Sequence, residues 1–251
     1  MDKEKNLHEG HRQRLKNRFL ESGLDDFQHH NILELLLFYS IPRKDTNDIA
    51  HELIDKFGSL SGVFDANIED LTQVNYITEN SATLIKLIPE IARAYLLDKS
   101  NHAGKIDNVE AIKEFLLSLY HGKKKEAVYA LFLNNSFELI GHKMIHEGSV
   151  NSSMVDVRLV LEELIKVNGS MLILAHNHPN GSVFPSYEDI ETTTHLLKIF
   201  QPFNIPFIEH FVVNEIDCYP IIHNTPSLKM CCSENKNLFS GNRVADLSDF
   251  Q

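Results

Sequence analysis

Two histidines and an aspartate carry the clearest chemical signal in the chain. His176 and His178 are two residues apart, and Asp189 follows eleven residues after His178. Alternate residues of a β-strand project from the same face, so both imidazoles point the same way. Two imidazoles and a carboxylate can hold one metal ion and leave a fourth position for water, as in a catalytic zinc site. We therefore expect these three residues to be metal ligands and Zn²⁺ to be the cofactor.

A strand, a turn and a helix are predicted to position these residues. The apolar run Met171–Ala175 is typical of a buried strand, and Pro179–Gly181 predicts a turn after it. Ser186 begins an amphipathic helix and stands three residues before Asp189, which is a helix-capping arrangement. In a metal hydrolase the hydroxyl group of Ser186 can also help to hold the oxyanion of a tetrahedral intermediate. Both roles stay open, and Ser186 is a candidate catalytic residue.

The first hundred residues show only helical patterns. Pro89, inside the last of these patterns, predicts a kink or a break. We expect an all-helical N-terminal domain over residues 1–98 and a polar linker over residues 99–107. The expected helices cover residues 8–21, 31–39, 45–57, 68–73 and 81–97.

Strands and helices alternate in the second half of the chain. This alternation predicts an α/β domain with a mixed sheet over residues 108–223, followed by a polar, loosely ordered tail over residues 224–251. The expected strands are residues 127–133, 137–146, 171–175, 205–213 and 218–222. The expected helices are residues 108–120, 154–167 and 186–200.

The composition favours a cytoplasmic protein without a membrane partner. The longest apolar runs are too short to cross a bilayer, and the first residues lack an apolar signal region. The three cysteines form neither a disulfide framework nor a CxxC pair. A net charge of −11 opposes nonspecific binding to DNA. One basic cluster, Arg12, Arg14 and Arg18, is either the solvated face of a helix or a set of contacts to phosphate.

The string HNHPNGSVFPSYED, residues 176–189, resembles the JAMM motif of the MPN/JAB superfamily. The HNHP opening, the PS before the helix and the D-I-x-x-T continuation are similar to the RadC branch in particular. Glu209-His210 stands where that family has Asp-His, and Arg158 where it has an arginine. Gly148–Ser152 is similar to its G-T-x-N-[AS] strand end, and the ELLLFYS and DKFGSLSGV stretches to its helical region. The likeness covers residues from about 8 to 223.

The resemblance implies a cytidine-deaminase-like α/β/α domain of the JAB/MPN type that binds zinc. Active members of the superfamily are metalloproteases that cut isopeptide bonds to ubiquitin-like modifiers. We therefore expect a zinc-dependent hydrolase, a metallopeptidase of the JAMM type that cleaves a peptide or isopeptide bond in a protein or peptide substrate. One alternative is a DNA-associated repair or recombination accessory protein with a structural metal site, because the RadC branch carries a DNA-repair label. Another is an inactive interaction module that retains the metal.

A JAMM protease also needs an upstream glutamate to take a proton from the zinc-bound water. Glu147, just before Gly148 at the end of a predicted strand, is our candidate for this catalytic base. Glu138, Glu162 and Glu163 are rivals. An exposed charge at a strand end is the alternative interpretation of Glu147.

The chain departs from the RadC pattern in its N-terminal half, where members of that family often carry a helix-hairpin-helix whose G-h-G turn holds DNA phosphate. The matching stretch here, residues 74–80 (VNYITEN), has no glycine and contains an acid. We expect the backbone geometry of the hairpin to be lost, which disfavours DNA as a partner.

His210 has two interpretations. It lies in the expected strand 205–213, among apolar residues. It is either a core histidine with satisfied hydrogen bonds or a residue that supports the metal ligands from behind.

Overall fold

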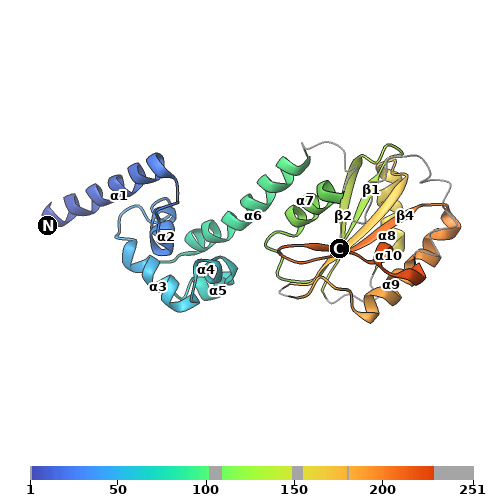
Figure 1. Ribbon diagram of the computed structural model, residues 1–251. Coiled ribbons are helices and arrows are strands. Elements are labelled where there is room, and N and C mark those ends of the chain that lie inside the picture. Colours follow the sequence, from blue (N-terminus) through green and yellow to red (C-terminus); the bar gives the residue numbers. More distant parts are fainter. Residues whose placement is uncertain (1, 102–108, 149–154, 180, 229–251) are drawn as a thin grey trace. The chain divides into compact units, whose positions relative to one another are not determined.

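The structure is a computed structural model that describes residues 2–101, 109–148, 155–179 and 181–228 (Figure 1). Residues 149–152, Asn180 and the predicted tail beyond residue 228 lie outside the described residues. The chain divides into two compact units, Met1–Ala92 and Arg93–Gln251. The division falls inside helix α6 (Glu79–Asn101) and not at the predicted linker. Residues 99–101 of that linker are helical, and its remainder is outside the described residues.

Within its described residues the first unit consists of helices and turns around a small apolar core. Gly58 takes the left-handed conformation (φ 81°) and ends a helix, as a C-terminal glycine does. Pro89 does not break α6, which continues on both sides of it. Five fully buried side chains of the core are Leu33, Leu37, Leu53, Leu71 and Ile85. Besides α6, the helices are α1 (Asp2–Ser22), α2 (His29–Leu37), α3 (Asn47–Phe57), α4 (Leu60–Asp65) and α5 (Ile68–Leu71).

The second unit contains one mixed sheet of five strands in the order β2-β1-β3-β4-β5. The pair β3–β4 is parallel and the other neighbouring pairs are antiparallel. The strands are β1 (Ala127–Leu133), β2 (Leu139–Glu147), β3 (Met171–Asn177), β4 (Phe207–Val213) and β5 (Cys218–Pro220). The last strand is shorter than predicted, because residues 221–224 form helix α10 (Ile221–Asn224). The buried carboxylate of Glu209 accepts hydrogen bonds from the backbone N–H groups of Ile222 and His223 in this helix.

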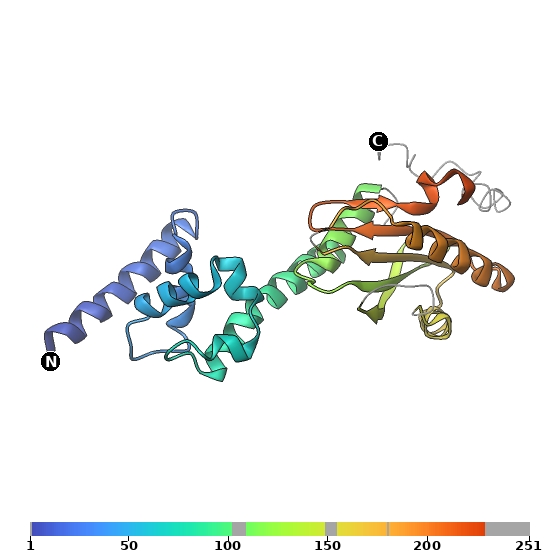
Figure 2. The same ribbon diagram turned by 90° about the horizontal axis from the view of Figure 1, so that it is seen from below.

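Helices cover both faces of this sheet, and Figure 2 shows α9 running alongside the strands. Helix α7 (Val109–Tyr120) packs on the face that carries Ala127, Tyr129 and Ala175. Helices α8 (Val157–Lys166), α9 (Tyr187–Phe200) and α10 pack on the face that carries Val128 and Leu174. All residues of β1 and β3 are buried, as expected for strands covered on both faces. A 3-10 turn, η1 (Gln201–Phe203), follows α9. None of the described helices is long and apolar enough to span a membrane.

Candidate metal centre

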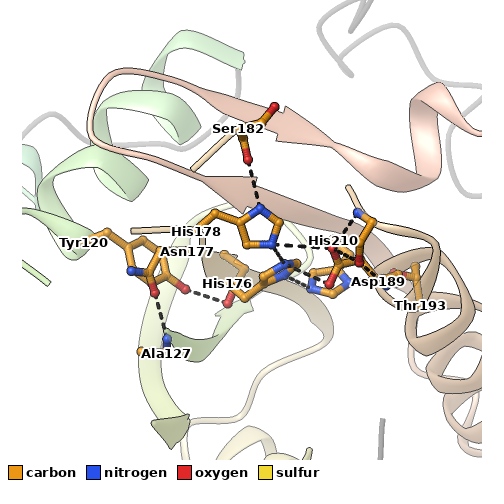
Figure 3. Close-up of polar contacts among 11 residues, drawn as sticks. Tyr120, Ala127, His176, Asn177, His178, Ser182, Asp189, Thr193 and His210 are labelled. Carbon is orange, nitrogen blue, oxygen red and sulfur yellow. Dashed lines mark hydrogen bonds and ion pairs between the residues drawn. The ribbon is translucent and has the colours of Figure 1, made fainter. Parts of the chain in front are cut away.

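The structure brings together His176, His178 and Asp189 (Figure 3). The two histidines lie at the carboxyl end of β3, and Asp189 lies in the first turn of α9. The Nε2 atom of His176 is 3.2 Å from Nε2 of His178 and 3.1 Å from Oδ1 of Asp189. The Nε2 atom of His178 is 3.5 Å from Oδ2 of Asp189. Within the described part of the chain, these are the residues whose ligand atoms lie close enough together to hold one metal ion.

The hydrogen bonds of the two rings show that this donor set fits a cation. The Nδ1 atom of His178 is 2.9 Å from the backbone carbonyl oxygen of Ser182, which can only accept, so Nδ1 carries the proton. In the neutral ring, Nε2 of His178 therefore presents a lone pair. The Nδ1 atom of His176 is likewise occupied, at 2.9 Å from Nε2 of His210. Two nitrogen atoms and a carboxylate oxygen converging in this way match the ligand types of zinc.

Ser186 holds the carboxylate of Asp189 in place. Its backbone N–H and its hydroxyl group both donate to Oδ2 of Asp189, each at 2.7 Å. In return, its Oγ accepts the backbone N–H of Asp189 at 3.1 Å. This reciprocal pair is the capping box that the spacing of the two residues predicts. The cap therefore starts α9 and orients a candidate metal ligand with the same bonds.

The charges of the group are coupled. Burial alone would raise the pKa of the Asp189 carboxyl group, but hydrogen bonds to His176 and His178 hold the pKa well below its usual range. The hydrogen bond to Asp189 raises the pKa of His178 above its ordinary value, although burial opposes this. The carbonyl group of Ser182 and the charges of Asp189 and Glu126 also raise the pKa of His178.

Burial lowers the pKa of His210 well below the ordinary histidine value, so this ring is neutral.

Glu126 is the carboxylate that the sequence analysis did not identify. The β1–β3 ladder pairs Val128 with His176, so these two side chains lie on the same face of the sheet. Glu126 precedes Val128 by two residues and lies directly before β1, so continuation of the strand alternation would place it on that face, opposite His178. The effect of its charge on the pKa of His178 is consistent with this placement. The sequence shows only an acid directly before a strand, and that signal says nothing about which strand lies opposite.

Asn177 fixes the register that gives Glu126 this position. Its Oδ1 accepts the backbone N–H of Ala127 at 2.7 Å, and its Nδ2 donates to the backbone carbonyl of Lys125 at 3.1 Å. The side chain points to the opposite face from the two histidines that flank it, where the hydroxyl of Tyr120 donates to the carbonyl of Ala175 at 2.6 Å. Asn177 thus joins the end of β3 to the start of β1.

The structure does not bring Glu147 to the candidate metal centre. Glu147 pairs with Ala127 in the β1–β2 ladder, and Ala127 belongs to the α7 face of the sheet. Its carboxylate oxygens lie 3.6 Å from Nζ of Lys125 and 4.0 Å from Nζ of Lys123. Successive residues of a strand point to opposite faces of the sheet, so the pairing with Ala127 places Glu147 on the α7 face. The structure therefore does not support our expectation that Glu147 is the base.

The three rival glutamates make contacts in other places. Oε2 of Glu138 accepts a hydrogen bond from Asn134 in the β1–β2 turn. On α8, Glu162 pairs with Arg158, and Glu163 pairs with Lys166. These contacts give no support for a catalytic role.

Two of the three clustered arginines of the first unit have structural contacts. The guanidinium of Arg12 donates to the backbone carbonyls of Ile41 and Lys44 and lies 4.6 Å from the ring centroid of Phe38. Arg18 likewise donates to a backbone carbonyl and lies over an aromatic ring. These contacts favour a stabilising role over contacts to phosphate.

The turn that matches the family's hairpin keeps a left-handed residue without a glycine. Tyr76 has φ 67°, and the N–H of Ile77 donates to the carbonyl of Val74 at 3.1 Å. Val74 and Ile77 are both buried. A left-handed residue other than glycine costs about 1–2 kcal/mol, and the burial of Val74 and Ile77 on either side is consistent with packing that offsets this cost.

Comparison with known proteins gives two findings. A family model described as a RadC-like JAB domain matches residues 106–225. A UPF0758 protein of Fusobacterium nucleatum subsp. nucleatum is 35% identical over 214 residues, which is 82% of this chain and 92% of the relative. The matched region of the family model contains the whole candidate metal centre.

Proposed function

Because the chain belongs to the RadC-like JAB domain family, we propose that it is a zinc-dependent hydrolase of the JAMM metallopeptidase type. Its substrate would be a peptide or isopeptide bond in a protein. The observation that carries the proposal is the convergence of His176, His178 and Asp189, with Glu126 close enough for its charge to raise the pKa of His178. Ligands and a carboxylate base in one place are what metal-assisted hydrolysis needs.

His176, His178 and Asp189 would hold the zinc ion. Bound zinc supplies a water of lowered pKa, about 7, and a Lewis acid for a carbonyl oxygen. Glu126 accepts a proton from the attacking water and returns it to the leaving amine, because a carboxylate next to the ligands can serve as base and then as acid.

Ser186 has two roles in this proposal, to orient Asp189 and to contact the oxyanion. Its hydroxyl proton is donated to Asp189 in the present arrangement, which orients the carboxylate. For contact with an oxyanion, the hydroxyl must rotate toward the substrate, while the backbone N–H of Ser186 keeps its own bond to Asp189.

The test is hydrolysis of a peptide library that includes lysine-linked isopeptides, followed by mass spectrometry. The full-length protein is assayed as purified, after removal of zinc with a chelator, and after zinc is restored. We expect cleavage that stops on chelation, returns with zinc and is absent from His178→Ala. A folded protein that binds no zinc, or cleavage that survives chelation, would contradict the proposal.

A further inference from the structure

A buried series of hydrogen-bonded side chains lies on the Nδ1 side of His176, and the proposed hydrolysis does not use it. His210 of β4 and Thr193 of α9 are 2% and 0% exposed. The Nδ1 atom of His176 is 2.9 Å from Nε2 of His210, and Nδ1 of His210 is 2.7 Å from Oγ1 of Thr193 (Figure 3). The Thr193 hydroxyl is in turn 2.6 Å from the backbone carbonyl of Asp189. The series thus connects one ligand to the backbone of another through two strands and a helix.

The partners in this hydrogen-bonded series determine which atom donates in each hydrogen bond. A carbonyl oxygen can only accept, so the single hydroxyl proton of Thr193 goes to Asp189. Oγ1 of Thr193 therefore accepts from His210, which puts the His210 proton on Nδ1 and leaves a lone pair on Nε2. That lone pair accepts the proton on Nδ1 of His176. In the neutral ring, the unprotonated nitrogen of His176 is consequently Nε2, the atom that faces Asp189.

A wrong tautomer of His176 would disable the site. With its proton on Nε2, the ring would present an N–H group to the metal position, and two lone pairs would face each other between His176 and His210. Both nitrogen atoms are buried, so no solvent is available to relieve either defect. The ring centroids of the two histidines are 4.9 Å apart, so the two rings lie next to each other in the core.

We propose that His210 and Thr193 are positioning residues that hold His176 in its zinc-binding tautomer before the metal arrives. The inference rests on the proposed function, because it assigns a role to residues behind the same ligands. Partners that orient metal-bound histidines typically change metal affinity by about 10- to 100-fold. This role differs from filling the core, since it depends on one acceptor atom and not on the volume of the ring.

The first measurement is zinc affinity of the full-length protein, by competition with a chromogenic chelator at one pH. We expect His210→Leu, which lacks the acceptor, to bind zinc about 10- to 100-fold more weakly than the wild type. His210→Gln can place Oε1 near the position of Nε2, so it should recover most of the loss. Thr193→Val, which keeps the shape but not the hydroxyl, should weaken zinc binding in the same direction.

The second measurement needs no metal. Nitrogen chemical shifts of the imidazole of His176 in the zinc-free protein at alkaline pH report which nitrogen carries the proton. We expect Nδ1 in the wild type and a mixture of tautomers in Thr193→Val. A protein that fails to hydrolyse peptides but shows this difference would contradict the proposed function and leave the positioning role intact.

The inference is overturned by any of three results. The first is a folded His210→Leu or Thr193→Val variant that binds zinc as tightly as the wild type. The second is a loss in His210→Leu that His210→Gln does not reduce, which would indicate a packing role. The third is a neutral His176 ring that carries its proton on Nε2 in the zinc-free wild type. If His210→Leu does not fold, Thr193→Val and the chemical shifts still decide the question.

Discussion

The Nε2 atoms of His176 and His178 lie 3.2 Å apart, although each ring has its Nδ1 atom occupied by another partner. In the neutral rings, both Nε2 atoms would direct lone pairs toward the carboxylate of Asp189. Such an arrangement needs a positive charge, and either a metal ion or a proton can supply it. The raised pKa of His178 and the lowered pKa of Asp189 are consistent with a proton occupying this place when no metal is bound.

Zinc content is the most direct prediction. We expect the purified protein to contain about one zinc per chain and His178→Ala to lose it, because three protein ligands are the usual number in catalytic zinc sites. Zinc at about 1,000 times its dissociation constant should raise the free energy of unfolding by about 4 kcal/mol. The control is His195→Ala, an exposed histidine of the same helix as Asp189, which should keep its zinc. Metal analysis and thermal unfolding with and without chelator measure both effects.

Zinc affinity should fall as the pH falls. Metal binding needs neutral histidines, so protons compete with zinc. The pKa of His178 is raised, so this competition should begin above the ordinary histidine value of about 6.5 and strengthen toward lower pH. Isothermal titration calorimetry over a pH series measures it. Histidine changes its charge between about pH 6 and pH 8, so a zinc affinity that stays constant over this range would contradict the prediction.

The zinc-free protein should show the opposite pH dependence. A group with a raised folded-state pKa stabilises the fold fully below its unfolded-state pKa, and this contribution is lost as the pH rises through the folded-state value. For His178 the loss should therefore occur above about pH 6.5, while Asp189 stays ionised throughout because its pKa is lowered. Unfolding of the chelator-treated protein tests this, with His178→Ala as the variant in which this pH dependence disappears.

Glu126→Gln should remove hydrolysis and keep zinc. Loss of a general base typically lowers the rate by about 100- to 10,000-fold, whereas Glu126 is not among the three converging ligands. The matched variant is Glu147→Gln, which changes a carboxylate on the other face of the sheet and should leave the rate unchanged. Rates and zinc content are measured on the same preparations. The reverse pattern, with activity lost only in Glu147→Gln, would restore Glu147 as the base.

Ser186→Ala should weaken both the helix and the metal site. Loss of a serine N-cap lowers the free energy of unfolding by about 1 kcal/mol. The same change removes the hydroxyl bond to Asp189, so zinc affinity should fall by about 10-fold. Ser186→Thr keeps the hydroxyl and serves as the conservative control. Chemical denaturation and chelator competition give the two values, and an alanine variant with wild-type zinc affinity would exclude the orienting role.

Arg12→Ala should destabilise the first unit. It removes hydrogen bonds from a charged group to two carbonyls and a contact with an aromatic ring, so we expect a loss of about 2 kcal/mol. Exposed Arg14 provides the control, and its alanine variant should unfold like the wild type. Denaturant unfolding of the two variants measures the difference.

DNA affinity at two salt concentrations tests the other interpretation of the same cluster. The net charge of −11 and the structural contacts of Arg12 lead us to expect weak binding that does not depend on Arg14. Tight, steeply salt-dependent binding that is lost in Arg14→Ala would instead support the DNA-associated alternative.

The sequence alone was enough to predict the three candidate metal ligands and the helix cap, because their geometry is local. The two-residue period of a strand places His176 and His178 on one face, and the three-residue spacing between Ser186 and Asp189 forms a capping box. The family resemblance is confirmed by the comparisons. Most helices and strands also follow from local patterns of apolar residues.

The tertiary structure decided which other residues meet these ligands. Glu126 and His210 reach the site through the pairing of β3 with β1 and with β4, and no local pattern specifies which strands become neighbours or in which register. A shift of one residue changes the face on which a side chain lies, so the sequence alone could not show which face of the sheet carries Glu147. Local patterns also did not predict that Tyr76 takes a left-handed conformation or that α6 continues on both sides of Pro89. The candidate ligands thus lie in one short segment of the sequence, whereas the proposed base and the proposed support of His176 depend on long-range strand pairing.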